Sequence, residues 1–369
     1  MTTPREIYRV EQLPVFQNRM FRTREDAIAC PKGDVVLAQD TQTGLISNRA
    51  FDPSLMVYDA EYQNEQAVSA IFSTHLDKVA AIVQRQFTGA SLVEVGCGKG
   101  HFLERLESLG FSVTGFDPTY EGEHARIARE YLSPTSGIQA DGIILRHVLE
   151  HVADPVSFLH GILRSNGGHG KIYIEVPCLD WIAASHAWFD IFYEHVNYFR
   201  AQDLQAMFGR VYEAGKTFGG QYLYVVADLS TLRIPQRLNG DEFQLPNDFL
   251  LSLEQCSQLI VSNARDAKAV LAVWGGASKG VIFALLMQRR GAPVDVLIDI
   301  NPAKQGRFVA ATGLLVQSPN EAAESLKPGA TVFVMNSNYL QEIRAMSGNR
   351  YNYVTVEHEA GLLRILIKR

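Results

Sequence analysis

Ionisable and aromatic side chains gather in residues 190–198 of this 369-residue chain. An imidazole titrates near neutral pH, so His195 could accept a proton from a reacting group, and Glu194 could tune it or replace it. The alternative is that both side chains only hold the segment in place by hydrogen bonds. The residues that form the cluster are Asp190, Phe192, Tyr193, Glu194, His195, Asn197 and Tyr198.

A buried strand must position this cluster. Residues 171–177, KIYIEVP, are apolar enough for a central strand, and the segment that holds His195 follows them. Open α/β sheets bind their ligands at the carboxyl ends of parallel strands. The order of these segments therefore places the cluster where such a sheet would hold a substrate.

A glycine-rich turn at residues 96–100 lies between an apolar strand (91–95) and a helical pattern. A second strand, 113–116, ends in Asp117, about twenty residues after the glycines. This spacing predicts a strand–turn–helix–strand unit that binds an adenosine-containing cofactor. Glu94 inside the first strand and a G-x-G-x-G pattern favour S-adenosylmethionine over a dinucleotide.

Each part of the predicted cofactor site has an expected role. The backbone at the three glycines would pass the methionine part, Asp117 would hold the ribose, and Glu94 would fix the turn or the amino group. Tyr62 would close over the cofactor or pack in the core. The residues expected around the cofactor are Glu94, Gly96, Cys97, Gly98, Gly100, Asp117, Pro118, Arg146, His147 and Tyr62.

The segment ADGIILRHVLEHVADP, residues 140–155, supplies a further strand over 142–145. Together with the turn, it resembles the class I methyltransferases. Methyl transfer from a sulfonium needs an aligned nucleophile and usually a base. His147 and His151 lie four apart on an expected helix, a spacing that could bind a metal, but no third ligand is evident. We therefore expect no metal there.

Composition limits the remaining classes of function. The net charge of −6 gives no general attraction to nucleic acid. No run of about eighteen apolar residues predicts a membrane span, and the charged first residues lack a signal core. The chain is expected to be cytoplasmic. Four distant cysteines without a C-x-x-C pair are expected to be free thiols.

A second α/β pattern starts at residue 269, after a polar linker over 230–246. Its strand, glycine turn (274–280) and helix could bind phosphate through backbone amides, or form only a tight turn. We expect an α/β fold with a class I methyltransferase Rossmann-like sheet, a second Rossmann-like sheet and a small N-terminal module. The expected domains are residues 1–65, residues 66–230 and residues 231–369 with the linker.

The segment IEVPCLDW…FDIFYEHVNYF resembles the sugar C-methyltransferases of deoxysugar biosynthesis, and VWGGASKG…VLIDINPAKQGRF resembles their C-terminal domain. This resemblance covers most of the chain. It implies a nucleotide-linked 4-keto sugar that is deprotonated at C3 and methylated there, with His195 as base, assisted by Glu194 and Tyr193. The residues that would then contact the substrate are Phe192, Asn197, Tyr198, Gln221, Ser278, Lys279, Asn301 and Lys304.

The chain departs from this family in three places, one of which is residues 219–223, GGQYL, where the family has a basic GGSLR-like segment. The family's four-cysteine zinc site is reduced to Cys30, so zinc is not expected. Phe192 stands where the family loop commonly has a tyrosine. Because these changes affect the substrate more than the cofactor, the acceptor could be another small secondary metabolite methylated on oxygen or nitrogen.

Two other classes of protein stay open, an NAD-dependent oxidoreductase and a binding protein without catalysis. Both glycine turns depart from the dinucleotide fingerprint, which counts against the first. The expected partners are a small-molecule substrate, with no nucleic acid and no membrane, and the chain is expected to be a monomer or homodimer.

Overall fold

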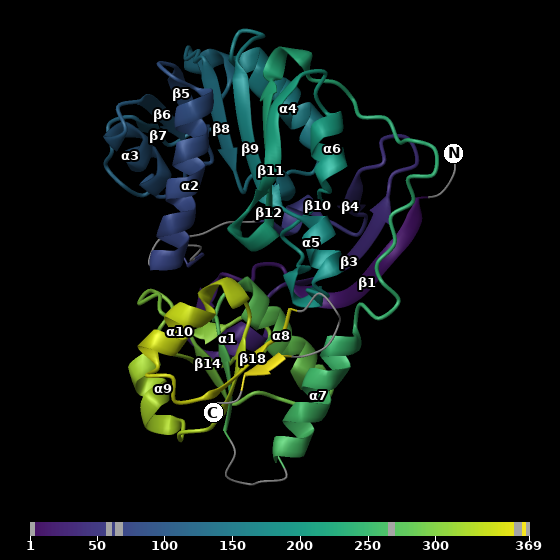
Figure 1. The fold of residues 1–369 in the computed structure, drawn as a ribbon, viewed down its shortest axis with the longest axis vertical. Coiled ribbons are helices and arrows are strands. Elements are labelled where there is room, and N and C mark those ends of the chain that lie inside the picture. The colour runs from purple at the N-terminus through teal and green to yellow at the C-terminus, as the bar shows by residue number, and fades with distance from the viewer. Residues whose placement is uncertain (1–3, 57–60, 63–68, 265–269, 358–363, 367–369) are drawn as a thin grey trace.

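The computed structural model describes residues 4–56, 61–62, 69–264, 270–357 and 364–366. Two α/β units lie one above the other in Figure 1, with the N-terminal strands beside the junction between them. The helices have these bounds: α1 Arg24–Ile28, α2 Ala70–Gln86, α3 His101–Ser108, α4 Pro155–Ser165, α5 Leu179–Ala184, α6 Ala201–Ala206, α7 Leu251–Ala264, α8 Ser278–Arg289, α9 Pro319–Ser325 and α10 Leu340–Met346.

The upper unit contains a seven-stranded sheet in the order β11-β12-β9-β8-β5-β6-β7. Its central strands pair in parallel, and β12 pairs antiparallel with both β9 and β11. The central strands are buried on both faces, as expected where helices cover a parallel sheet. The bounds are β5 Ser91–Val95, β6 Ser112–Phe116, β7 Ile127–Ala128, β8 Gly142–Arg146, β9 Lys171–Pro177, β11 Val211–Thr217 and β12 Tyr222–Asp228.

Helices cover both faces of this sheet. Apolar residues of α2 and α3 pack on one face, and those of α4 and α6 pack on the other. The predicted helix across His147 and His151 is wrong. His147 has a φ of 51°, which a helix does not accommodate, and only Leu149–His151 form a single 3-10 turn (η3) before α4 begins.

The lower unit contains a six-stranded sheet in the order β16-β14-β13-β17-β18-β19. Its strands pair in parallel except β18 and β19. Helices α7 and α8 pack on one face, and α9 and α10 on the other. This confirms the predicted second α/β sheet. The bounds are β13 Leu271–Trp274, β14 Val296–Ile298, β16 Val316–Gln317, β17 Thr331–Val334, β18 Asn352–Thr355 and β19 Arg364–Leu366.

The N-terminal strands form a four-stranded sheet, β1-β3-β4-β10, whose last strand is Asn197–Tyr198 from the segment that holds His195. A two-stranded ribbon, β2 with β15, joins this region to the lower unit. One hydrophobic core runs through the N-terminal sheet, α7 and α8. The other bounds are β1 Arg5–Pro14, β2 Met20–Phe21, β3 Lys32–Gln39, β4 Ile46–Asn48 and β15 Phe308–Val309.

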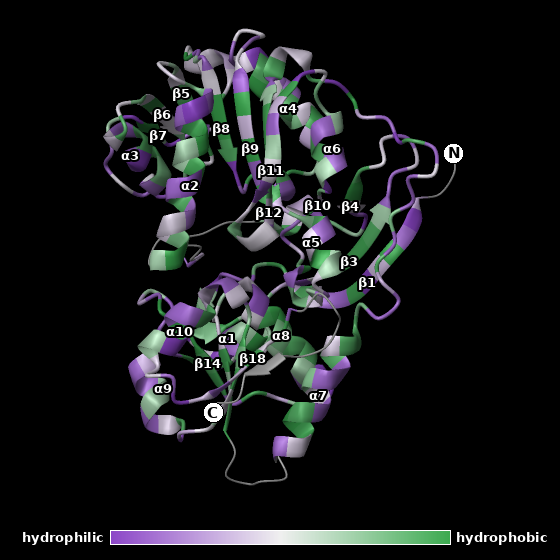
Figure 2. Cartoon of the chain, in the orientation of Figure 1, coloured by the Kyte–Doolittle hydropathy of each residue, from purple (hydrophilic) through white to green (hydrophobic). Residues whose placement is uncertain are grey.

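Hydropathy follows this packing. Figure 2 shows β3 as largely hydrophobic and α10 with hydrophilic residues on its outer side.

The predicted domain boundary between residues 65 and 66 lies outside the described residues. Among the helices described, none has both the length and the apolar character that crossing a membrane requires.

Candidate active site

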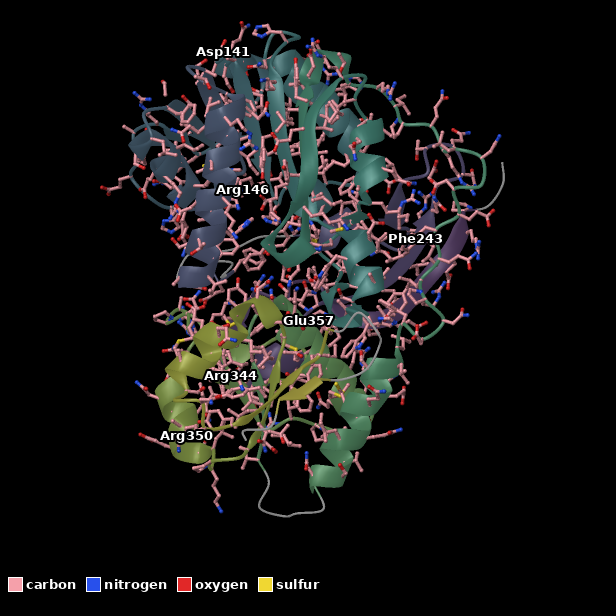
Figure 3. The ribbon with its side chains drawn as sticks, viewed as in Figure 1. Asp141, Arg146, Phe243, Arg344, Arg350 and Glu357 are labelled. Carbon is pink, nitrogen blue, oxygen red and sulfur yellow. The ribbon has the colours of Figure 1, made fainter. Side chains whose placement is uncertain are left out.

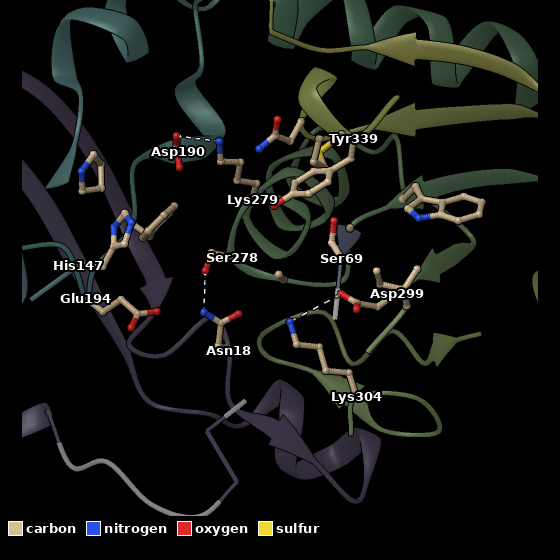
Figure 4. A pocket seen from close by; sticks show the side chains of 18 of the residues that line it. Asn18, Ser69, His147, Asp190, Glu194, Ser278, Lys279, Asp299, Lys304 and Tyr339 are labelled. Carbon is tan, nitrogen blue, oxygen red and sulfur yellow. Dashed lines mark hydrogen bonds and ion pairs between the residues drawn. The ribbon is translucent and has the colours of Figure 1, made fainter. Parts of the chain in front are cut away.

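A cavity of roughly 230 Å³ lies where the two α/β units face each other. Figure 4 shows side chains from both units pointing into it. Its upper wall follows the carboxyl ends of β8 and β9, and its lower wall follows the carboxyl ends of β13, β14 and β17. Among the lining residues are His147, Glu150, His151, Asp190, Phe192, Glu194, His195, Tyr222, Trp274, Ser278, Lys279, Asp299, Lys304, Met335 and Tyr339.

The segment that holds His195 lies inside the protein, because residues 186–200 are all buried. The amide of Asn197 donates to the carbonyl of Leu149, and Asn197 also pairs with Ser47 of β4. Tyr198 donates its hydroxyl to the carbonyl of Phe192. Since Asn197 and Tyr198 are used to fix the segment, neither lines the cavity.

His195 faces the cavity with a neutral imidazole. Its ring packs 4.3 Å from the ring of Phe192 and 4.9 Å from that of His151. Burial, and after it the neighbouring charges of His151, His147 and Lys279, hold the pKa of His195 well below its usual value. No hydrogen-bond partner of its ring nitrogens is present in the described part of the chain. The imidazole is therefore unprotonated at neutral pH, and the same burial makes it a weaker base than a solvated imidazole.

Glu194 also faces the cavity, and both of its carboxyl oxygens accept hydrogen bonds. Its Oε2 accepts a hydrogen bond from the Tyr62 hydroxyl at 2.8 Å, and its Oε1 accepts one from the Gln17 amide at 3.4 Å. Burial raises the pKa of Glu194, while His151 and Tyr62 act in the opposite direction. Tyr62, predicted to close over the cofactor, thus lines the cavity beside Glu194.

Tyr193 lies away from the cavity. Its hydroxyl accepts a hydrogen bond from the Asp52 amide at 2.8 Å, and its ring packs against Phe51. Gly33 lies so close to the ring that an added Cβ would come within 2.2 Å of it. The structure therefore gives Tyr193 a packing role and not the predicted catalytic one.

The glycine turn after β5 has the conformation that the sequence predicted. Gly96, Gly98 and Gly100 all have positive φ, and Asp117 Oδ2 accepts the Gly98 amide hydrogen at 2.9 Å. A Cβ on Gly96 would come within 2.3 Å of Val148, so only glycine fits there. No atom lies within 4 Å of the Cβ position of Gly98, which leaves the turn open on that side.

Glu94 sits beneath this turn with a buried Oε2 that has no partner. Burial raises the pKa of Glu94 to about 8, against the nearby charge of Arg146. A donor group from a ligand would satisfy this oxygen. The open turn and the unsatisfied carboxyl oxygen therefore fit a ligand that carries hydroxyl and ammonium groups, as S-adenosylmethionine does, and an ammonium group beside Glu94 would favour its ionised form.

The other residues predicted around the cofactor have varied surroundings. Cys97 is buried, and Pro118 is exposed. Arg146, at the carboxyl end of β8 (Figure 3), lies over the ring of Phe102 and 3.6 Å from Glu175.

His147 connects the interior of the upper unit to the cavity. Its Nδ1 lies 3.2 Å from Glu150 Oε1 and its Nε2 lies 3.1 Å from Glu175 Oε1. Burial alone would lower the pKa of His147, but the two carboxylates outweigh it and raise the pKa to about 9. Glu175 also accepts hydrogen bonds from His75 and Tyr173. His147 is therefore an imidazolium held between two carboxylates at neutral pH.

Lysines form much of the lower wall. Lys279 Nζ lies 3.0 Å from Asp190 Oδ2 and donates to Gln221 Oε1 at 3.0 Å. Lys304 Nζ lies 3.7 Å from Asp299 Oδ2. These ion pairs place one buried cation, Lys304, and one partly exposed cation, Lys279, beside the cavity, and the first pair links the two α/β units.

The remaining predicted substrate residues divide into two groups. Ser278 lines the cavity and accepts a hydrogen bond from Asn18 at 2.9 Å. Gln221 and Asn301 are buried behind the lining, where Gln221 bonds to Asn336 and Asn301 caps the turn at Ala303. The structure brings together the segment that holds His195 and the glycine turn at residues 274–280, which are about 80 residues apart in the sequence. No sequence pattern linked these two segments.

Sequence reasoning missed Glu150, Tyr222 and Glu175 as parts of this site. The ring of Tyr222 lies 4.5 Å from the ring of His147. The sequence did not reveal the three residues as neighbours because they lie on different strands and turns. The motif of His147 and His151 did carry a signal, since Glu150 stands between them. His147 is not part of the cluster that the structure forms here: Glu150, His151 and His195, the last from another loop, each offer an atom within 4.8 Å of the others.

Comparisons with known proteins agree with this architecture. Residues 62–211 match a family described as a methyltransferase domain. The ubiquinone biosynthesis O-methyltransferase of Ruegeria pomeroyi is 32% identical over 101 residues, which are 23% of this chain and 41% of that protein. The mitochondrial protein of the same name from Arabidopsis thaliana is 32% identical over 92 residues, 20% of this chain and 28% of that one. The chain thus spans less than half the length of these relatives.

A solved structure, the 1,6-didemethyltoxoflavin-N1-methyltransferase of Burkholderia thailandensis with S-adenosylhomocysteine, aligns with a TM-score of 0.34 at 16% identity. The alignment covers 51% of this chain and 96% of that one. A likeness at this level carries no argument about substrate. The family match is limited to residues 62–211, and the predicted α/β fold with a Rossmann-like methyltransferase sheet is confirmed.

Proposed function

We propose that this chain is an enzyme that uses S-adenosylmethionine to methylate a small molecule held in the cavity between its two α/β units. One observation carries the proposal. His195, a neutral and buried proton acceptor, faces a cavity at the same carboxyl edge of the sheet that bears the open turn at Gly98 and Asp117. The proposed donor site and the proposed acceptor site thus lie along one edge of the sheet, and none of the described residues of the glycine turn lines the cavity.

Residues of the upper unit would hold the cofactor. Amides of the glycine turn would lie close to its methionine part. Asp117 would accept a hydrogen bond from its ribose, and Glu94 would accept one from its ammonium group. When bound, the cofactor supplies a methyl group on an electrophilic sulfonium. His195 then accepts the proton that the acceptor must lose, a contribution of about 10²- to 10⁴-fold in rate.

The finer proposal is C-methylation of a nucleotide-linked keto sugar. The resemblance of the loop and lower unit to sugar C-methyltransferases supports it, and so do Lys279 and the buried Lys304 of the lower wall. Lys279 and Lys304 are paired with Asp190 and Asp299, so a diphosphate would replace these carboxylates as their partner.

A second candidate is O-methylation of another small metabolite. The name of the relatives, ubiquinone biosynthesis O-methyltransferase, favours it for the upper unit. In that reaction His195 would accept a hydroxyl proton, and the same cavity would hold the acceptor.

Calorimetry with S-adenosylhomocysteine and with NAD tests the cofactor first. We expect saturable binding of S-adenosylhomocysteine, and binding of NAD alone would overturn the proposal. A methyl-release assay against extracted nucleotide sugars then tests the acceptor class. His195→Ala should keep its affinity for S-adenosylhomocysteine while turnover falls about 100-fold or more. The matched control is His169→Ala at an exposed position, and unchanged turnover in His195→Ala would remove His195 from the mechanism.

A further inference from the structure

A cluster of two imidazoles and one carboxylate lines the cavity. Glu150, His151 and His195 come from the η3 turn and from the loop after α5, and each offers one ligand atom within 4.8 Å of the others. Two histidines with a glutamate and an open fourth position form a known arrangement for zinc in enzymes. All three residues line the cavity, so a bound ion would have such an open position.

His151 is already oriented as a metal ligand. Its Nδ1 lies 2.9 Å from the backbone carbonyl of Glu194, and a carbonyl can only accept. The Nδ1 therefore carries the proton, and the lone pair lies on Nε2. A hydrogen bond from the second ring nitrogen to a carbonyl is the outer-shell arrangement that fixes metal-bound histidines.

Glu150 supplies an independent observation. Its side chain is 1% exposed, and its Oε1 is held by His147 at 3.2 Å. Its Oε2 is buried and has no hydrogen-bond partner among the described residues. A buried carboxylate oxygen without a partner is costly, and a cation next to it would remove that cost.

We propose that Glu150, His151 and His195 bind a divalent transition-metal ion, with Zn²⁺ as the probe. Bonds of about 2.0–2.1 Å in a tetrahedral site place ligand atoms roughly 3.4 Å apart, so small rotations of Glu150 and His195 close the cluster. The ion takes the lone pair of His195. Where His195 is the proton acceptor of the proposed function, on which this consequence rests, bound metal and methyl transfer exclude each other.

The test measures Zn²⁺ binding to the full chain by competition with a chromophoric chelator. Glu150→Gln keeps the shape of the side chain and His151→Gln removes an imidazole, while His169→Ala removes an exposed histidine as a matched control. We expect one Zn²⁺ site whose affinity falls more than tenfold in the first two variants and is unchanged in the control. Substitution by Co²⁺ should give a visible absorption band that both variants lose.

Each outcome decides the proposal. Unchanged Zn²⁺ affinity in the two cluster variants, or an equal loss in the control, would overturn the site. If Glu150→Gln does not fold, as judged by circular dichroism, His151→Gln carries the test. Added Zn²⁺ should slow methyl release, and faster release would overturn the exclusion. Calorimetry with S-adenosylhomocysteine on the same preparations separates the two proposals, since loss of that binding would contradict only the proposed function.

Discussion

The His147 imidazolium should make the stability of the upper unit depend on pH. Two carboxylates, Glu150 and Glu175, raise its pKa from 6.5 to about 9, and its side chain is 24% exposed. One pKa unit corresponds to about 1.36 kcal/mol, so this difference amounts to about 3 kcal/mol of folding free energy. Arg146 and Tyr222 also face this network, which is why the change must be assigned to His147 by substitution.

The direction follows from which state binds the proton more tightly. The folded state has the higher pKa, so the stabilisation is fully present below about pH 6.5 and is lost as the pH rises through about 9. Urea unfolding of the full chain, followed by circular dichroism between pH 6 and 10, measures this loss. In His147→Gln, stability near pH 6.5 should fall by about 3 kcal/mol, and the slope between pH 6.5 and 9 should flatten.

A direct reading of the pKa completes the experiment. Histidines labelled with carbon-13 at Cε1 give one resonance each, and the resonance absent from His147→Gln identifies His147. It should titrate near pH 9, whereas that of exposed His169 serves as the control. An ordinary His147 titration, or an unchanged slope in the variant, would refute the reasoning that two carboxylates hold a buried imidazolium.

Two further substitutions, one of them with a control in α4, test the two glycine turns. Gly280→Ala would place a Cβ 1.9 Å from the Gly275 carbonyl oxygen and should lower the free energy of unfolding by about 1–3 kcal/mol. The control, Gly161→Ala in α4, meets only one atom at 4.0 Å and should be neutral or stabilising by up to about 1 kcal/mol. Equal urea midpoints for the two variants would contradict this prediction. Asp117→Ala removes the acceptor for the Gly98 amide and for the proposed ribose, so calorimetry should show S-adenosylhomocysteine binding at least about tenfold weaker, and unchanged affinity would exclude Asp117 from the site.

Local patterns predicted the two sheets and the cofactor turn because their information lies within short segments. The strand at 91–95, the three glycines and Asp117 fall within 27 residues, and their hydrogen bond from Gly98 to Asp117 is a contact inside one βαβ unit. Hydrophobic spacing is likewise a local signal in α7, where Leu253, Cys256 and Ile260 are all buried.

Local sequence patterns did not predict the role of a residue whose partner lies far away in the sequence. Tyr193 and His195 stand two apart in one motif, yet Tyr193 bonds to Asp52 and His195 faces the cavity. The helix expected across His147 and His151 does not form, since His147 turns back between Glu150 and Glu175. Secondary-structure propensity carries no information on such pairings, because they depend on which strands become neighbours in the fold.

Spacing along a few dozen residues encodes the α/β class, the cofactor turn and the segment rich in ionisable groups, so each could be predicted without the fold. The contact of His195 with His151 and Glu150, and the ion pair of Lys279 in the lower unit with Asp190 in the upper one, could be found only in the folded chain. The physical reason is that charge pairing and burial act through space. They therefore arise only when the packing of two sheets and the N-terminal strands brings distant loops together.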